Sequence, residues 1–271
     1  MAVKSILCTY SGDPDKGSGL AHAIRVAKHH DAYLTGVIRH GLTFVHWQLS
    51  AQLPSTVVDQ IRSSEAKQIE EIANRFRRIV DEAGIGDRAE FVDLDSSRDG
   101  PLTDFSRAFD VIITGNHASS FNQDPFTTPP DVLALRSGRP VLIVPQGFKA
   151  EGVAPHALVA WDGKRAATRA LVAAMPFLET KGHITLLTVG DKPLNTGRLV
   201  QTLERHGVPA DAVSVAPRGS IADTILQESE ARGARLIVMG AYEHSKFTHD
   251  LTGGVTTTLL KQTQVPVLIA H

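Results

Sequence analysis

The residues best suited to chemistry are three glycines that follow an apolar run late in the sequence. Gly240 comes directly after the run 235–239, and Gly253 and Gly254 stand where the next helix is expected to begin. A glycine lets a ligand approach the backbone closely. The N–H groups at a helix start attract an anion such as phosphate. The pattern therefore indicates a phosphate-binding turn.

Histidines in the same segment suggest a second kind of site. His244 and His249 lie five residues apart beside Glu243, and His117 follows the equivalent apolar run earlier in the chain. Imidazole and carboxylate groups both bind zinc, so a metal site is an alternative interpretation. The spacing matches no specific zinc motif, and no metal ligand is assigned.

Catalytic signatures are absent from the sequence. Gly17-Ser18-Gly19 lacks the spacing of the Gly-x-Ser-x-Gly turn of α/β hydrolases. The three closely spaced glycines of the dinucleotide fingerprint are also missing. We therefore assign no catalytic residue and expect a binding protein without specific metabolic catalysis.

Short apolar runs predict the strands that would position these residues. The runs are 4–9, 33–39, 89–94, 110–114, 140–145, 156–161, 183–189, 212–216, 235–239 and 265–270. Because they are apolar throughout rather than alternating, both faces of each strand should be covered, as in a parallel sheet.

Segments with helical periodicity lie between the runs. They cover 17–30, 101–108, 130–138, 164–178, 194–206, 220–233 and 254–263, and a long apolar stripe extends from Val58 to Ala83 before Gly84. A long loop is expected over 41–55. The alternation of strands and helices predicts right-handed crossovers and a doubly wound α/β sheet in each half.

An internal repeat divides the chain into two copies of one domain. The run 110–114 with Gly115 resembles 235–239 with Gly240, and a second apolar run follows each glycine after a similar interval, at Pro140 and Pro266. The start repeats as well, because 6–12 resembles 157–163. A short segment with two glycines at 146–152 predicts domains over 1–148 and 149–271.

The second half resembles the universal stress protein family. Its nucleotide loop has a glycine, two residues, a glycine, nine residues, then a glycine followed by serine or threonine. Gly240 and Gly253 match the first and third glycines, and the strand that ends Trp161-Asp162-Gly163 and the closing run 265–270 also look like the family. The resemblance covers the whole chain as architecture, and the specific motif covers 235–270.

The resemblance implies a Rossmann-like fold of the adenine nucleotide alpha hydrolase type, with two tandem domains of mainly parallel five-stranded sheets and helices on both faces. It also implies an intramolecular pseudo-dimer joined through the edge strands 140–145 and 265–270, and a homodimer is a further expectation. The implied ligand is an adenine nucleotide, ATP or AMP, with Mg²⁺ for a polyphosphate. Its implied contacts are Asp162, Val189, Met239, Gly240, Gly253, Gly254, Val255 and Thr256.

Departures from the family pattern bear on this site. Glu243 replaces the second glycine and would repel a polyphosphate unless a divalent cation bridges them, and Gly254 replaces the hydroxyl residue. In the first half, both later glycines are missing and Ser11 stands in place of the aspartate. Pro129 and Pro130 also lack the N–H groups that would bind phosphate. The first half is not expected to bind ATP in the family's manner.

Composition and charge argue against several further classes of protein. A formal net charge of −1 gives no basic excess for nucleic acid, and no run approaches the roughly 20 apolar residues of a membrane span. Cys8 is the single cysteine, so no intrachain disulfide can form, and it should be a small buried side chain. The sequence begins without a signal-like apolar stretch, so a cytoplasmic location is expected.

Three functions follow for testing. The first is a stress-response protein that acts through a bound small ligand. The second is a weak ATP hydrolase or phosphotransferase that uses the loop after Gly240. The third is an interaction protein that binds no nucleotide, which Glu243 and the altered first half favour.

Overall fold

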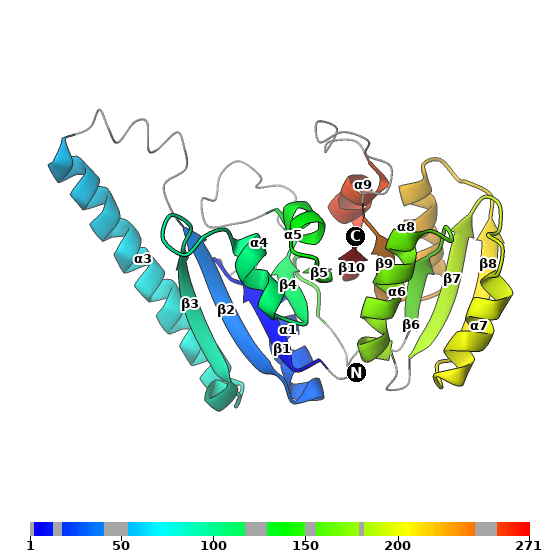
Figure 1. Ribbon diagram of the computed structural model, residues 1–271, viewed down its shortest axis with the longest axis horizontal. Helices are drawn as coiled ribbons and strands as arrows, with labels where there is room; N and C mark the ends of the chain where they lie inside the picture. Colours follow the sequence, from blue (N-terminus) through cyan, green and yellow to red (C-terminus); the bar gives the residue numbers. More distant parts are fainter. Residues whose placement is uncertain are drawn as a thin grey trace.

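The computed structural model describes residues 3–12, 18–40, 54–116, 129–149, 156–178, 182–241 and 254–271. They form an α/β structure around one sheet of ten strands (Figure 1). The strands are β1 (Ser5–Thr9), β2 (Tyr33–His40), β3 (Ala89–Asp95), β4 (Val111–Gly115), β5 (Val141–Val144), β6 (His156–Ala160), β7 (His183–Val189), β8 (Ala210–Val215), β9 (Leu236–Gly240) and β10 (Val267–Ala270). All ten predicted strands are confirmed.

Helices alternate with these strands as the periodicity predicted. They are α1 (Ser18–His30), α3 (Ser55–Glu82), α4 (Leu102–Phe105), α5 (Pro130–Arg136), α6 (Arg165–Leu178), α7 (Thr196–Arg205), α8 (Ile221–Ala231) and α9 (Val255–Gln262). Short 3-10 turns, η2 (Gly86–Arg88) and η3 (Ser106–Ala108), precede β3 and follow α4. The single helix predicted over 101–108 is therefore wrong in detail, because only four residues of it are α-helical. No helix in the described ranges has the length and apolar character to cross a membrane.

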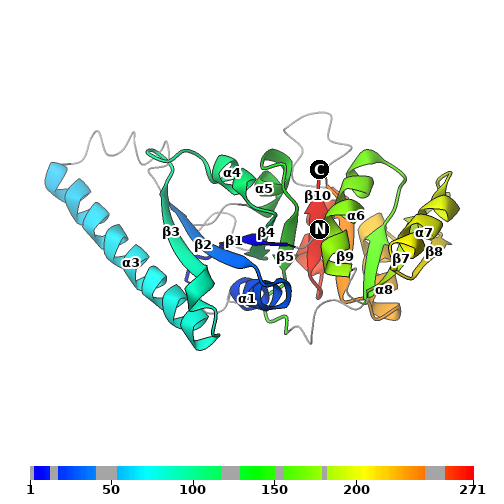
Figure 2. The ribbon, with the colours of Figure 1, turned by 60° about the horizontal axis from the view of Figure 1, so that its bottom comes forward.

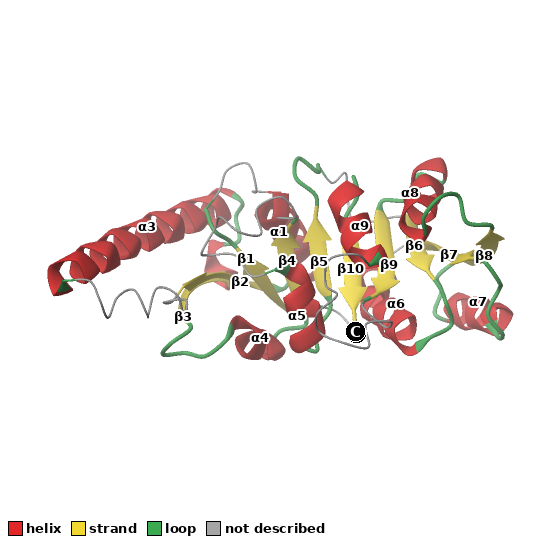
Figure 3. Ribbon diagram, turned by 90° about the horizontal axis from the view of Figure 1, so that it is seen from above, coloured by secondary structure: helices red, strands yellow, loops and turns green. Residues whose placement is uncertain are grey.

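The order of strands is the same in the two halves. The sheet runs β3-β2-β1-β4-β5-β10-β9-β6-β7-β8, so the halves follow the same order outward from a central junction. Pairing is parallel within each half and antiparallel between β5 and β10, where Val267 pairs with Ile143 and Ile269 with Val141. Figure 3 shows these two strands pointing in opposite directions. The predicted joining of the halves through their edge strands is confirmed.

Two hydrophobic clusters cover the two faces of the sheet, and each one extends through both halves. One cluster packs α1, α3, α6 and α7 against the sheet, and the other packs α4, α5, α8 and α9. In Figure 1, α5 and α9 lie together above β5 and β10. Each hydrophobic core is therefore shared across the junction between the two halves. The domain boundary near residue 148 stays a prediction.

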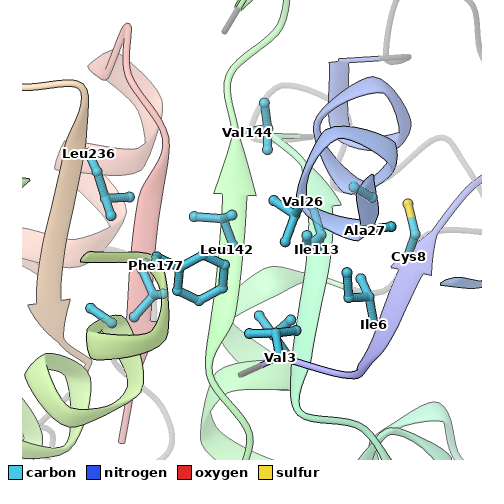
Figure 4. Packing of buried hydrophobic residues seen from close by; sticks show 14 of the residues in the cluster. Val3, Ile6, Cys8, Val26, Ala27, Ile113, Leu142, Val144, Phe177 and Leu236 are labelled. Atoms are coloured by element: carbon cyan, nitrogen blue, oxygen red, sulfur yellow. The ribbon is translucent and has the colours of Figure 1, made fainter. Parts of the chain in front are cut away.

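Side chains from both halves meet where the cores cross the junction. Phe177 of α6 is 5% exposed and lies beside Leu142 of β5 (Figure 4). The ring centre of Phe177 is also 5.6 Å from that of His30 on α1, in an edge-on arrangement. Apolar packing between the halves therefore adds to the backbone pairing of β5 and β10.

The outer end of the first half differs from that of the second. Figure 2 shows α3 extending along the outer side of β3. The C-terminal part of α3 packs into the core through Ile69, Ile72, Phe76 and Val80, whereas Ile61 near its start is 52% exposed. This helix is twice as long as α6, the next longest described helix.

Candidate functional site

The register of three adjacent strands brings the predicted ligand residues to one edge of the sheet. Ala160 of β6 pairs with Leu187 of β7 and with Met239 of β9. Asp162 comes two residues after Ala160, Val189 two residues after Leu187, and Gly240 one residue after Met239. All three therefore lie at the carboxyl edge of β9, β6 and β7, where α/β sheets bind ligands.

Asp162 is held by its own loop. Its Oδ1 atom accepts a hydrogen bond of 3.0 Å from the backbone N–H of Lys164, and its Oδ2 atom lies 3.8 Å from the ammonium group of Lys164. The side chain remains 49% exposed. An aspartate that bonds the backbone two residues later forms a local turn, which fixes the carboxylate while leaving lone pairs for a ligand.

The loop after β6 packs against the loop after β7. Gly163 has φ +75°, and a Cβ atom added there would lie 2.8 Å from the Cβ atom of Pro193. A left-handed backbone and a close neighbour both require glycine at this position. Trp161 stabilises the same turn, because its N–H donates to Leu187 and its carbonyl accepts from the hydroxyl of Thr188. The edge around Asp162 is thus a packed structure, and no pattern in the sequence predicts the contact of Pro193.

Gly240 has a packing role. A Cβ atom at this position would lie 2.6 Å from the carbonyl carbon of Ala166 and 2.6 Å from the nitrogen of Ala167, at the start of α6. In the first half, α1 and β4 approach each other equally closely, and here a glycine of the helix allows it. A Cβ atom added to Gly19 of α1 would lie 2.7 Å from the backbone nitrogen of Gly115 in β4. Contact between helix and strand therefore explains Gly240 without a ligand.

Val189 and Met239 occupy different environments. Val189 is partly buried and packs against the cluster beneath α8 and α9 at the end of β7. Met239 is 5% exposed and belongs to the interior of the same cluster. Val189 can therefore present an apolar surface at the edge, whereas the side chain of Met239 serves the core.

Helix α9 begins at this edge. Gly254 is its N-cap residue with φ −81° and ψ 164°, and the first bond of the helix runs from the N–H of Thr258 to the carbonyl of Gly254. Val255 packs against the core, and Thr256 is 5% exposed. Groups at such a helix start favour an anion. A Cβ atom on Gly254 would meet open space, so nothing described here requires glycine at the cap.

Other predicted residues lie outside the described ranges. They are Gly253, Glu243 and the histidines of the metal alternative, His117, His244 and His249. Within the described ranges, no group of three or more histidine, cysteine, aspartate or glutamate side chains could hold a metal ion.

The corresponding edge of the first half is arranged differently. Gly12, the counterpart of Gly163, has φ +78°, and a Cβ atom there would lie 2.6 Å from Ile72 of α3. The guanidinium group of Arg75 donates to the carbonyl of Gly12. Helix α5 follows Pro129 as its N-cap and has Pro130 in its first turn. The long helix α3 thus occupies the place that Pro193 takes in the second half, and the sequence did not indicate this contact.

Comparisons with known proteins show what the chain is similar to. Residues 192–271 match the model of the universal stress protein family. A curated universal stress protein of Synechocystis sp. is 26% identical over 176 residues, which are 62% of this chain and 60% of that protein. The chain therefore spans about three fifths of the length of that relative.

Solved structures extend the likeness to nearly the full chain. A universal stress protein from Archaeoglobus fulgidus matches with a TM-score of 0.72 and 18% identity, covering 98% of this chain and 96% of that one. A putative universal stress protein from Pseudomonas aeruginosa matches with a TM-score of 0.55 and 15% identity, covering 99% and 93%. The chain is thus an α/β protein that shares the Rossmann-like fold of these structures. The resemblance to the universal stress protein family is confirmed.

Proposed function

We propose that the protein binds an adenine nucleotide, ATP or AMP, at the carboxyl edge of its second half and acts in a stress response through this ligand. The observation that carries the proposal is the register that places Asp162, Val189 and Gly240 side by side, next to the start of α9. Parallel α/β sheets bind ligands at such an edge. The proposal includes no turnover of the ligand.

Each part of the edge suits one part of a nucleotide. The exposed carboxylate of Asp162 can accept hydrogen bonds from ribose hydroxyl or adenine amino groups. Val189 offers an apolar contact for the base. The start of α9 at Gly254 suits phosphate, and Mg²⁺ would accompany a polyphosphate in this proposal.

Titration calorimetry with ATP and AMP, with and without Mg²⁺, tests the proposal. Asp162→Asn keeps an oxygen for the bond from Lys164 but removes the charge, and should weaken adenine nucleotide binding by roughly tenfold, about 1.4 kcal/mol. Asp191→Asn is the matched control, because Asp191 is exposed in the adjacent loop after β7. Equal weakening in both variants would mean that Asp162 has no specific contact.

Two further variants examine the departures from the family pattern. Gly254→Ser restores the hydroxyl in open space and should tighten phosphate-dependent binding. Glu243→Gly removes the carboxylate from the loop and should tighten ATP binding most when Mg²⁺ is absent. If only the Glu243→Gly protein binds, the nucleotide site has been lost from the natural sequence.

A role without nucleotide is the competing proposal, and the packing of Gly240 against Ala166 favours it, since that glycine needs no ligand. It expects no heat of binding and no thermal shift with ATP, AMP or ADP. A thermal shift of several degrees with any of them would exclude it.

Our assignment also includes tandem domains over 1–148 and 149–271, a cytoplasmic location and a homodimer. These remain predictions of the sequence. Light scattering of the purified chain distinguishes a monomer from a homodimer.

A further inference from the structure

Four polar side chains form a hydrogen-bonded chain at the opposite, amino edge of the second half. His156 begins β6, His183 and Thr185 lie in β7, and Asp211 lies in β8. His156 pairs with His183 and Thr185 with Asp211, so neighbouring strands place all four together. Thr185 is 1% exposed, whereas the side chains of His183 and Asp211 are 45% and 44% exposed.

The distances define one continuous path. The Nδ1 atom of His156 lies 3.1 Å from the carbonyl oxygen of Arg232, just beyond α8, and its Nε2 atom lies 3.0 Å from the hydroxyl of Thr185. The same hydroxyl lies 3.1 Å from Oδ1 of Asp211, and Nε2 of His183 lies 3.0 Å from that oxygen. The path links β6, β7, β8 and the end of α8.

The partners of His156 determine which of its ring nitrogens carries a proton. A carbonyl oxygen only accepts, so Nδ1 of His156 carries a proton in both charge states of the ring. Neutral His156 then has a bare Nε2 atom, which can accept the hydroxyl proton of Thr185 only when that proton is not donated to Oδ1 of Asp211. Protonated His156 donates from Nε2 instead, so the hydroxyl accepts that bond and is able to donate to Asp211.

We infer that the path is a proton-operated switch, in which the Thr185 hydroxyl donates to neutral His156 and turns to Asp211 when His156 is protonated. The protonated state joins an imidazolium to a carboxylate through one buried hydroxyl. Charge-assisted hydrogen bonds are stronger than neutral ones, so proton uptake tightens the link between the end of α8 and the three strands.

The groups around His156 determine when the switch operates. His183 and Asp211 face it from β7 and β8, and Arg232 lies beside it at the end of α8, paired through Nε with Glu228 at 3.0 Å. Arg235 precedes β9 and its N–H donates to the carbonyl of His156. Burial lowers the pKa of His156 and His183 lowers it further, whereas the bond to Arg232 and the charge of Asp211 act in the opposite direction. The protonated state therefore forms only at a pH below the ordinary histidine value of 6.5.

Imidazole ¹H–¹⁵N spectra of the ¹⁵N-labelled protein across a pH series test the inference directly. His156→Gln and His183→Gln variants assign the two rings. Neutral His156 should carry its proton on Nδ1, whereas free histidine favours Nε2. A proton on Nε2 of neutral His156 would overturn the inference.

Substitutions of Thr185 test the hydroxyl. Thr185→Val keeps the shape but removes the acceptor for imidazolium, so the protonation midpoint of His156 should fall by roughly 0.5–1 pH unit. Thr185→Ser should restore the midpoint of the natural protein. Thr188→Val is the matched control, because Thr188 is also buried in β7 but donates to Trp161. An unchanged midpoint in folded Thr185→Val protein, or an equal fall in the control, would refute the switch.

Discussion

His22 should make the protein sensitive to acid through the junction between its halves. It lies on α1 with its ring centre 6.0 Å from that of Phe148, next to the predicted domain boundary. Burial lowers the pKa of His22 from 6.5 to about 4, and the charge of Arg25 contributes in the same direction. Its Nδ1 atom has no hydrogen-bond partner in the part of the chain that the structure describes. Protonation would thus bury a charge without compensation.

The size of the effect follows from the two pKa values of His22. Because the folded value is depressed, stability is complete above pH 6.5 and is lost as the pH falls toward 4. Each pKa unit corresponds to about 1.4 kcal/mol, so the full loss is about 3 kcal/mol. Lowering the pH from 7 to 5 should remove about 2 kcal/mol of unfolding free energy.

Urea denaturation at pH 7 and pH 5 of the natural protein and of His22→Leu measures this contribution. His30 and His156 also have lowered pKa values, so both proteins should lose stability in acid. The natural protein should lose about 2 kcal/mol more than the variant, because leucine cannot be protonated. Equal losses in the two proteins would refute the assignment of the effect to His22.

Three further outcomes follow from the packing around individual residues. Gly240→Ala should reduce the free energy of unfolding by roughly 1–3 kcal/mol, because the added Cβ atom would lie 2.6 Å from the backbone of α6. Gly254→Ala is the control, because a Cβ atom there meets open space, and it should cost less than about 1 kcal/mol in the same urea denaturation assay. Phe177→Ala should reduce the free energy of unfolding by about 3–5 kcal/mol and lower the melting temperature of both halves together, as measured by calorimetry. Separate melting of one half would contradict the shared cores. Burial raises the pKa of Cys8 to about 12. An aromatic disulfide reagent at pH 8 should therefore leave the thiol unmodified until denaturant is added. Rapid reaction in the folded protein would contradict the burial of Cys8.

The elements of the fold could be predicted because apolar periodicity marks them directly. All ten strands and the long helix before Gly84 follow from it. The apolar run predicts that β8 begins at residue 212, whereas the strand begins at Ala210. Asp211 interrupted the apolar run, and its side chain is accommodated by hydrogen-bonding partners that the sequence could not show.

The candidate site could be predicted only in part. The family resemblance implies Asp162 and Val189, the position after an apolar run indicates Gly240, and the parallel register brings the three together. The contact of Pro193 with Gly163 involves residues 30 positions apart in different loops, with no periodic signal. The packing of α6 on Gly240 is likewise a tertiary contact. From the sequence alone, this glycine indicates only that a ligand approaches the backbone.

The pairing of β5 with β10 has a consequence for synthesis on the ribosome. Ile143 and its partner Val267 are 124 residues apart in the chain. At roughly 5–20 residues per second, the first half waits about 6–25 s with the edge of β5 uncovered. A bare strand edge of four apolar residues, Val141–Val144, readily pairs with other chains. The nascent first half is therefore the stage at which chaperone binding would matter most for this protein.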